Sequence, residues 1–145
     1  MAPGSGVPFG QRIGSRTVEV PVELGTPDVA AGELLVATLG DQRAMWFFSE
    51  YRDSALEEAQ FETSVVRTEI GYRVDVTAAN LVRDIALLVD KVDQHARVDD
   101  QLVTLLPGES VTFTVTSASE LDEAALVSPD VLRSANQLMT VRAAR

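Results

Sequence analysis

The sequence predicts an all-β protein that folds as a β-sandwich with short helices near its C-terminus. Several runs rich in β-branched residues alternate between apolar and polar side chains, the pattern of strands with one buried face. Turn signals separate these runs at regular intervals, as in a sandwich of antiparallel strands. After residue 118 the alternation gives way to Ser-initiated segments that favour short helices.

The N-terminal part begins with residues 1–16, which are rich in Gly, Pro and Ser and predict an irregular arm. The next run, Thr17–Leu24, alternates strictly and predicts a strand. Pro21 cannot donate a ladder hydrogen bond, so we expect this strand at a sheet edge or beside a bulge. Residues 1–8 contain neither a charged nor an apolar segment typical of a signal peptide, and none is expected.

Two short apolar runs, at residues 34–39 and 44–48, predict strands joined by a Gly-containing turn. The second run, Ala-Met-Trp-Phe-Phe, is apolar on both faces, so we expect it to be buried on both. Residues 49–60 lose the alternation and are interpreted as a linker between two groups of strands.

The clearest alternation lies beyond this linker. Residues 61–68 and 72–78 predict two strands joined by a tight turn, with Tyr72, Val74, Val76 and Ala78 facing inward. Residues 81–90 fit both a helical stripe and a strand period. Their length and their position between strands favour a strand.

The last strands and the tail follow the same logic. Residues 102–106 and 110–116 predict strands on either side of a Pro-Gly-Glu turn. Ser119 is suited to cap a helix that extends to Leu126. Ser128-Pro129 repeats the signal and predicts a second helix at residues 131–138.

Composition and charge exclude several classes of function. The chain has 145 residues, and 12 Lys and Arg against 22 Asp and Glu give a net charge of −10. Nucleic-acid binding depends on clustered positive charge, so we expect no nucleic-acid partner. No apolar run approaches the roughly 20 residues of a transmembrane helix, so we expect no membrane partner. The absence of Cys excludes disulfides, thiolate nucleophiles and thiolate metal sites.

The titratable residues form no recognisable catalytic constellation. The lone His95 lies in a charged connector without a nearby candidate nucleophile, and a solvent-exposed position is favoured. The acidic residues of this connector (Asp90, Asp93, Asp99 and Asp100) lack the spacing of a calcium loop, although a weak calcium site remains an alternative. The pairs Glu57–Glu58 and Asp99–Asp100 are sequence neighbours that point to opposite faces of an extended chain. We therefore expect no catalytic residue, no metal site and no cofactor.

Four aromatic residues occur within six positions: Trp46, Phe47, Phe48 and Tyr51. An exposed platform of Trp46 and Tyr51 would stack on the apolar face of a sugar ring, which makes these two residues candidate carbohydrate-binding residues. In the alternative, which we favour, Trp46 and Phe48 fill one side of a sandwich core and Phe47 the other, because aromatic residues dominate the cores of small domains.

Several segments, taken in their order along the chain, resemble a known family. The stretch at residues 72–90, then Val98-Asp-Asp100, then Leu-Leu-Pro-Gly-Glu at 105–109 and an alternating strand, resembles the C-terminal immunoglobulin-like domain of β-mannosidases in glycoside hydrolase family 2. The segment 43–51 is similar to the closing strand of the immunoglobulin-like domain that precedes it.

The resemblance implies a division of the chain. Residues 59–117 would be the C-terminal immunoglobulin-like β-sandwich, and residues 118–145 a helical tail. Residues 17–58 would supply a linker and strands, which either end a preceding immunoglobulin-like domain or add to the same sandwich. Residues 1–16 would remain an irregular arm.

The resemblance also implies a function. The whole enzyme would be a retaining β-mannosidase with two catalytic glutamates on a (β/α)₈ barrel of about 250 residues, too large for this chain. No catalytic motif of the family matches any position here. We therefore expect a non-catalytic accessory domain whose partners are the catalytic barrel and neighbouring domains of the parent glycosidase. An autonomous carbohydrate-binding module that binds a saccharide through Trp46 or Tyr51, and a protein-interaction module, remain the alternatives.

Overall fold

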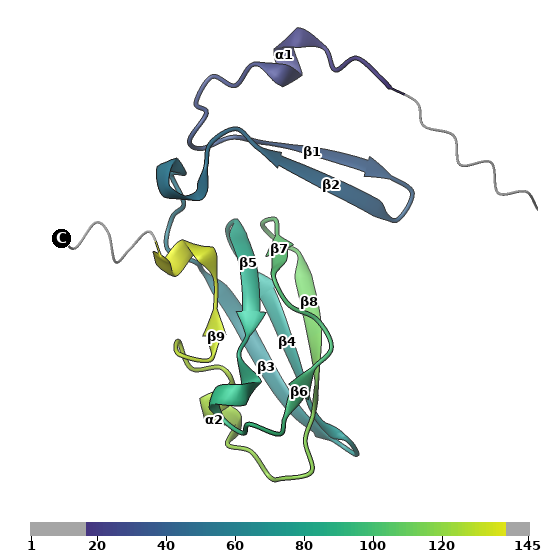
Figure 1. Ribbon diagram of the computed structural model, residues 1–145, viewed down its shortest axis with the longest axis vertical. Coiled ribbons are helices and arrows are strands. Elements are labelled where there is room, and N and C mark those ends of the chain that lie inside the picture. The colour runs from purple at the N-terminus through teal and green to yellow at the C-terminus, as the bar shows by residue number, and fades with distance from the viewer. Residues whose placement is uncertain (1–16, 139–145) are drawn as a thin grey trace, which may run out of the picture.

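The computed structural model describes residues 17–138, which form a β-sandwich and a separate β-hairpin (Figure 1). Every strand pair is antiparallel. The prediction of an all-β sandwich with short helices is confirmed. The arm expected at residues 1–16 and the tail beyond residue 138 lie outside the described residues.

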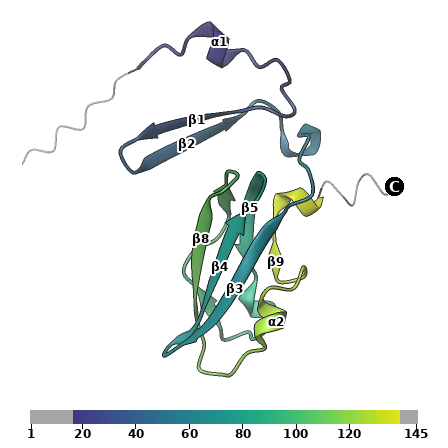
Figure 2. The same cartoon turned by 180° about the vertical axis from the view of Figure 1, so that it is seen from behind.

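Two stacked sheets make up the sandwich, as the opposite views in Figures 1 and 2 show. The first sheet contains, in hydrogen-bonded order, β3 (Phe61–Thr68), β4 (Gly71–Ala78), β8 (Ser110–Thr116) and β6 (Arg97–Val98). The second contains β7 (Val103–Leu105), β5 (Val82–Leu87) and β9 (Leu132–Arg133). A short 3₁₀ helix, η2 (Val89–Lys91), follows β5.

The core lies between the sheets and is built from alternate residues of their strands. The inward residues that the sequence predicts on β4, Tyr72, Val74, Val76 and Ala78, are all at most 2% exposed. They pack against side chains from both sheets, including Phe113, Val115, Ile85, Leu87 and Leu132. The buried Tyr72 hydroxyl is also satisfied, because it donates to the Leu121 carbonyl at 3.1 Å and accepts from the Leu121 N–H at 2.8 Å.

The hairpin consists of β1 (Leu34–Leu39) and β2 (Gln42–Phe47) and lies beyond one end of the sandwich (Figure 1). The expectation that residues 44–48 are buried on both faces is wrong, because none of them is fully buried. The assignment of Trp46 to the core is also wrong, since its side chain is 65% exposed. Both errors have one cause: this strand belongs to the hairpin and contributes nothing to the sandwich core.

The strand expected at Thr17–Leu24 is absent. This segment contains only the short helix α1 (Val22–Gly25), and its residues are exposed. Alternation produces a strand only where a neighbouring strand supplies hydrogen bonds, and no strand of the described part of the chain lies beside this segment.

Two details after β8 also differ from expectation. The helix α2 (Glu123–Leu126) is capped by Asp122, whose carboxylate accepts from the Ala124 N–H at 3.0 Å, and Ser119 is not its cap. The helix predicted at residues 131–138 is confined to residues 135–138. Its first part is instead β9, which pairs with β5 through Arg133 opposite Ala86 and Leu132 opposite Leu87.

Within residues 17–138, none of the helices has the length and apolar character needed to cross a membrane.

The start of β4 gives the first testable prediction. Gly71 has φ = +150°, and a Cβ there would overlap the Val115 carbonyl on the adjacent strand β8. Gly71→Ala should therefore lower the free energy of unfolding by more than about 2 kcal/mol, measured by urea denaturation.

Gly25→Ala is the matched control, because a Cβ at Gly25 meets open space. We expect a change within about 0.5 kcal/mol for this variant. Equal stability of the Gly71 variant and the wild-type protein would contradict the strand packing described here.

Candidate functional site

The candidate site is built around a β-bulge in β5. Val82 pairs with Leu105 and Ile85 with Val103, so Arg83 and Asp84 together oppose the single residue Thr104. Asp84 has φ = +50°, and its N–H donates to the Thr104 hydroxyl at 3.2 Å. The extra residue keeps Val82 and Ile85 in the core and turns Arg83 and Asp84 toward the end of the sandwich that faces the hairpin.

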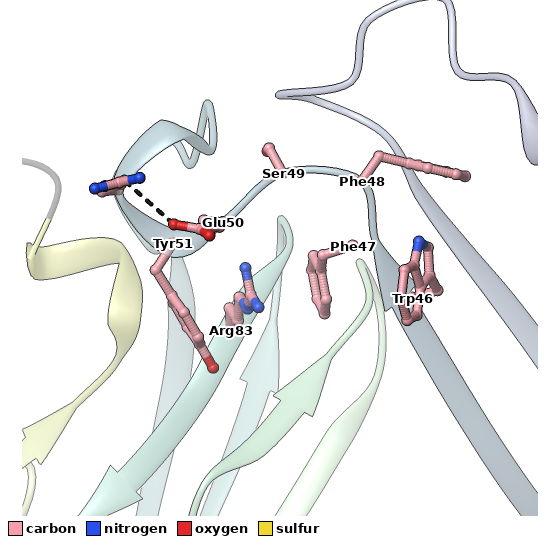
Figure 3. Close-up of a pocket in the computed structure, with 8 residues that line it drawn as sticks. Trp46, Phe47, Phe48, Ser49, Glu50, Tyr51 and Arg83 are labelled. Carbon is pink, nitrogen blue, oxygen red and sulfur yellow. Dashed lines mark ion pairs between the residues drawn. The ribbon is translucent and has the colours of Figure 1, made fainter.

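The Arg83 guanidinium lies between two aromatic rings (Figure 3). Its central carbon is 3.6 Å from the ring centroid of Phe47, at the end of β2, and 3.6 Å from that of Tyr51. Tyr51 belongs to the short 3₁₀ helix η1 (Tyr51–Asp53) that follows the hairpin. The Arg83 side chain is only 9% exposed. Cation–π contacts that exclude water in this way contribute up to about 2 kcal/mol each.

A hydrogen bond adds to this contact. The Tyr51 hydroxyl donates to an Asp84 carboxylate oxygen, and the other Asp84 oxygen accepts from the Thr104 hydroxyl at 3.2 Å. The hydrogen bond to the Asp84 carboxylate, followed by desolvation, raises the pKa of Tyr51 above its ordinary value of 10.0. The phenol therefore stays protonated at neutral pH and keeps its role as a donor.

A salt bridge forms a second contact between the hairpin and the sandwich. Arg43 Nη1 on β2 lies 2.6 Å from Glu109 Oε1 in the turn before β8, and Nη2 donates to the Thr104 carbonyl at 2.9 Å. The Arg43 guanidinium, together with the Leu106 N–H that Glu109 also accepts, lowers the pKa of Glu109 below its ordinary value of 4.5. Both side chains are about one-third exposed.

Two asparagines join the linker to the sandwich. The fully buried Asn136 donates from Nδ2 to the carbonyls of Glu57 and Leu81, each at 2.8 Å, and its Oδ1 accepts from the Arg83 N–H at 2.9 Å. Asn80 donates to the Glu58 carbonyl and accepts from the Gln60 N–H. These bonds fix the backbone that leads from Tyr51 into β3.

A groove of about 690 Å³ opens where these elements meet, and we call it the aromatic groove (Figure 3). Its lining consists of Trp46, Phe47, Phe48, Ser49, Glu50, Tyr51, Arg52 and Arg83. Trp46 and Tyr51 are 65% and 48% exposed. The lining of the groove thus combines an exposed indole with a largely buried guanidinium.

The two candidate carbohydrate-binding residues, Trp46 and Tyr51, therefore line the same groove. Tyr51 is constrained there, because one face of its ring contacts Arg83 and its hydroxyl bonds to Asp84. Sequence reasoning missed Arg83 itself. The available signal was a charged pair, Arg83-Asp84, inside an otherwise apolar strand.

Of the other titratable candidates, His95 and Asp93 lie close together, but only at the exposed surface. His95 is 81% exposed and lies 3.5 Å from Asp93 on the surface. Asp99 accepts from the Thr114 N–H at 2.8 Å, and this backbone hydrogen bond is the main cause of its lowered pKa. In the described part of the chain, no group of His, Asp or Glu residues is arranged to hold a metal ion.

Comparison with known proteins identifies the sandwich. A family model named Ig_mannosidase, described as an Ig-fold domain, matches residues 56–137, which is more than half of the chain. No curated protein matches the sequence. The match confirms the immunoglobulin-like fold expected from the sequence.

The Arg43–Glu109 salt bridge predicts that the free energy of unfolding depends on pH. A lowered pKa in the folded state means that Glu109 stabilises the fold above its ordinary pKa, and that this contribution is lost as pH falls through the lowered value. Glu109→Gln should therefore reduce the free energy of unfolding at about pH 7, and the difference from wild type should shrink by about pH 3. Urea denaturation at both pH values measures this.

Glu120→Gln is the control, because the pair of Glu120 with Arg67 is highly exposed on both sides. Exposed pairs contribute little, so we expect a small effect at both pH values. A Glu109→Gln effect that does not change between the two pH values would exclude the ionised carboxylate as its cause.

Proposed function

We propose that this chain, which belongs to the Ig_mannosidase family of Ig-fold domains, is part of a larger glycosidase. In that enzyme it is a non-catalytic accessory domain. The enzyme is of the β-mannosidase type, in glycoside hydrolase family 2. In this proposal the full-length enzyme hydrolyses terminal β-mannosides on a separate catalytic barrel. The accessory domain packs against that barrel and the neighbouring domains and stabilises their arrangement.

The attachment of the hairpin to the sandwich supports this role. Arg83 and Glu109, both on the sandwich, each bind a residue of β2. One end of the sandwich is thus built to hold a β-structure that precedes it in the chain. Such a fixed contact is what a domain needs in order to position its neighbour.

The other face of the hairpin indicates what that neighbour is. Ala37 and Ala44 lie opposite each other on this face, with Leu35 opposite Trp46 and Leu39 at the tip, 84% exposed. A two-stranded hairpin is marginally stable by itself. We therefore assign residues 17–58 to the end of a preceding immunoglobulin-like domain and the linker that follows it, with further strands of that domain covering this apolar face.

A substitution in the parent glycosidase tests the packing role. Leu39→Lys places a charge on the apolar hairpin face, and it should lower the thermal midpoint of the enzyme by about 2–4 °C because that face is buried against the neighbouring domain. The kcat on an aryl β-mannoside should not change, since in this proposal Leu39 contacts the preceding immunoglobulin-like domain and not the catalytic barrel.

Ile70→Lys is the matched control. Ile70 is 56% exposed in the turn between β3 and β4, at the opposite end of the sandwich from the hairpin. We expect the midpoint of this variant to remain near that of the wild-type enzyme. Hydrolysis of the aryl mannoside by the isolated 145-residue chain would refute the non-catalytic role.

The aromatic groove favours a second candidate function, the binding of a saccharide, which is an alternative to the first assignment because it requires that no neighbouring strand covers Trp46. The specific observation is that Trp46 and Tyr51 line one groove and that the Trp46 ring is largely exposed. Exposed aromatic rings suit the apolar C–H face of a sugar.

Calorimetric titration of the chain with β-1,4-mannohexaose tests this candidate. We expect saturable binding that is weakened at least about tenfold by Trp46→Ala, which corresponds to about 1.4 kcal/mol. Leu24→Ala, an exposed apolar position on α1, is the control. Equal affinity of the wild-type and Trp46 variants would exclude the groove as the binding site.

A further inference from the structure

A second hollow, which we call the lateral hollow, lies on the outer face of the sheet β7–β5–β9. Its volume is about 270 Å³. Ala86 and Ala135 contribute small, largely buried side chains to its lining, whereas Tyr51, Leu102 and Leu138 are each at least 48% exposed. A cavity of about 150 Å³ holds a benzene ring, so the lateral hollow accommodates a large apolar side chain.

The backbone at Leu102 holds this leucine at the surface in a conformation that bulky residues rarely adopt. Leu102 has φ = +58°, in the left-handed region. Two hydrogen bonds of the preceding residue fix the turn: the Gln101 N–H donates to Asp100 Oδ1 at 2.8 Å, and Gln101 Nε2 donates to the Leu87 carbonyl at 2.9 Å. A strained backbone that presents an exposed apolar side chain indicates a contact with another protein surface.

Arg133 gives the lateral hollow a cation without an acidic partner. It lies opposite Ala86 in the β5–β9 pair and lines the hollow. Its Nε donates to Gln137 Oε1 at 3.4 Å, but none of the ion pairs within residues 17–138 includes it. The chain does not lack acids, since it has 22 acidic and 12 basic residues. A partner with a carboxylate beside an apolar side chain would complement both Arg133 and the hollow.

The position of the lateral hollow distinguishes its partner from the preceding domain. In the proposed function that domain covers the apolar face of the hairpin, whereas the hollow lies on the sheet face turned to the viewer in Figure 1 and away from the viewer in Figure 2. Through Tyr51, which also contacts Arg83, the hollow is continuous with the attachment of the hairpin. We therefore expect a second neighbour from the same enzyme, seated beside the first.

We propose that the lateral hollow docks an outer helix of the catalytic barrel of the parent glycosidase. An apolar side chain of that helix fills the hollow against Leu102, and an acidic residue one turn away pairs with Arg133. Helices form the outer layer of a (β/α)₈ barrel, and side chains one turn apart lie on the same helix face. This inference rests on the proposed accessory role, and it specifies the surface through which the sandwich contacts the barrel.

Photo-cross-linking in the parent glycosidase identifies what covers the hollow. Leu102 is replaced by the photoreactive p-benzoylphenylalanine, and the peptides joined on irradiation are identified by mass spectrometry. We expect a cross-link to an outer helix of the barrel. Its yield should fall at least about fivefold when Arg133→Glu places a like charge against the acidic partner. The same photoreactive residue at Ile70, exposed at the other end of the sandwich, is the control and should give no cross-link to the barrel.

Leu102→Asn tests the contact by thermal denaturation in two settings. In the isolated 145-residue chain the midpoint should rise by about 2–4 °C, because Asn tolerates the left-handed conformation and the leucine is 66% exposed. In the parent glycosidase the midpoint should fall by at least about 2 °C, because the contact with the barrel is lost. Ile70→Asn is the matched control and should shift the midpoint equally in both proteins.

The other outcomes overturn the inference in distinguishable ways. A lower midpoint of the isolated Leu102→Asn chain would show that this leucine packs within the chain itself. A cross-link to residues 139–145, to the preceding domain or to a second copy would assign the hollow to that occupant, and absence of any cross-link would refute docking. If Leu39→Lys destabilises the parent enzyme and Leu102→Asn does not, the accessory role stands and the docking surface is refuted.

Discussion

The position of the hairpin on the sandwich depends on the buried Arg83 guanidinium, with the Arg43–Glu109 salt bridge as a second contact. Arg83 contacts Phe47 at the end of the hairpin and Tyr51 in the following 3₁₀ helix, so a single side chain of β5 fixes two segments that precede it by more than 30 residues. The interaction is stronger than its surface equivalents because the side chain is largely removed from water.

Much of the sandwich could be predicted from the sequence, because its strands have one face in the core. The alternation in residues 72–78 and 110–116 therefore reports directly on burial. The same logic was wrong for Thr17–Leu24, where the alternation is present but no partner strand is found in the described part of the chain. It was also wrong for Trp46, because an apolar strand in a hairpin outside the core has the same composition as a core strand.

The site could be predicted only in part. The cluster of aromatic residues drew attention to Trp46 and Tyr51, but their assembly into a groove requires the bulge at Arg83 and Asp84. The position of a bulge depends on the register between two neighbouring strands. The periodicity of one short segment carries no information about that register. The contacts of Asn136 are of the same kind, since they join the Glu57 carbonyl of the linker to Leu81 and Arg83, at and just before the start of β5.

The placement of Asn136 constrains how the protein folds during synthesis. Its side chain bonds to the Glu57 carbonyl, 79 residues earlier in the chain, and the adjacent β9 supplies an outer strand of the second sheet. A nascent chain cannot complete that sheet, or fix the linker backbone at Glu57, before residue 136 has left the ribosomal exit tunnel. Contacts of such long sequence separation form slowly, so the hairpin and the first sheet stay partly uncovered until residues 132–136 reach them.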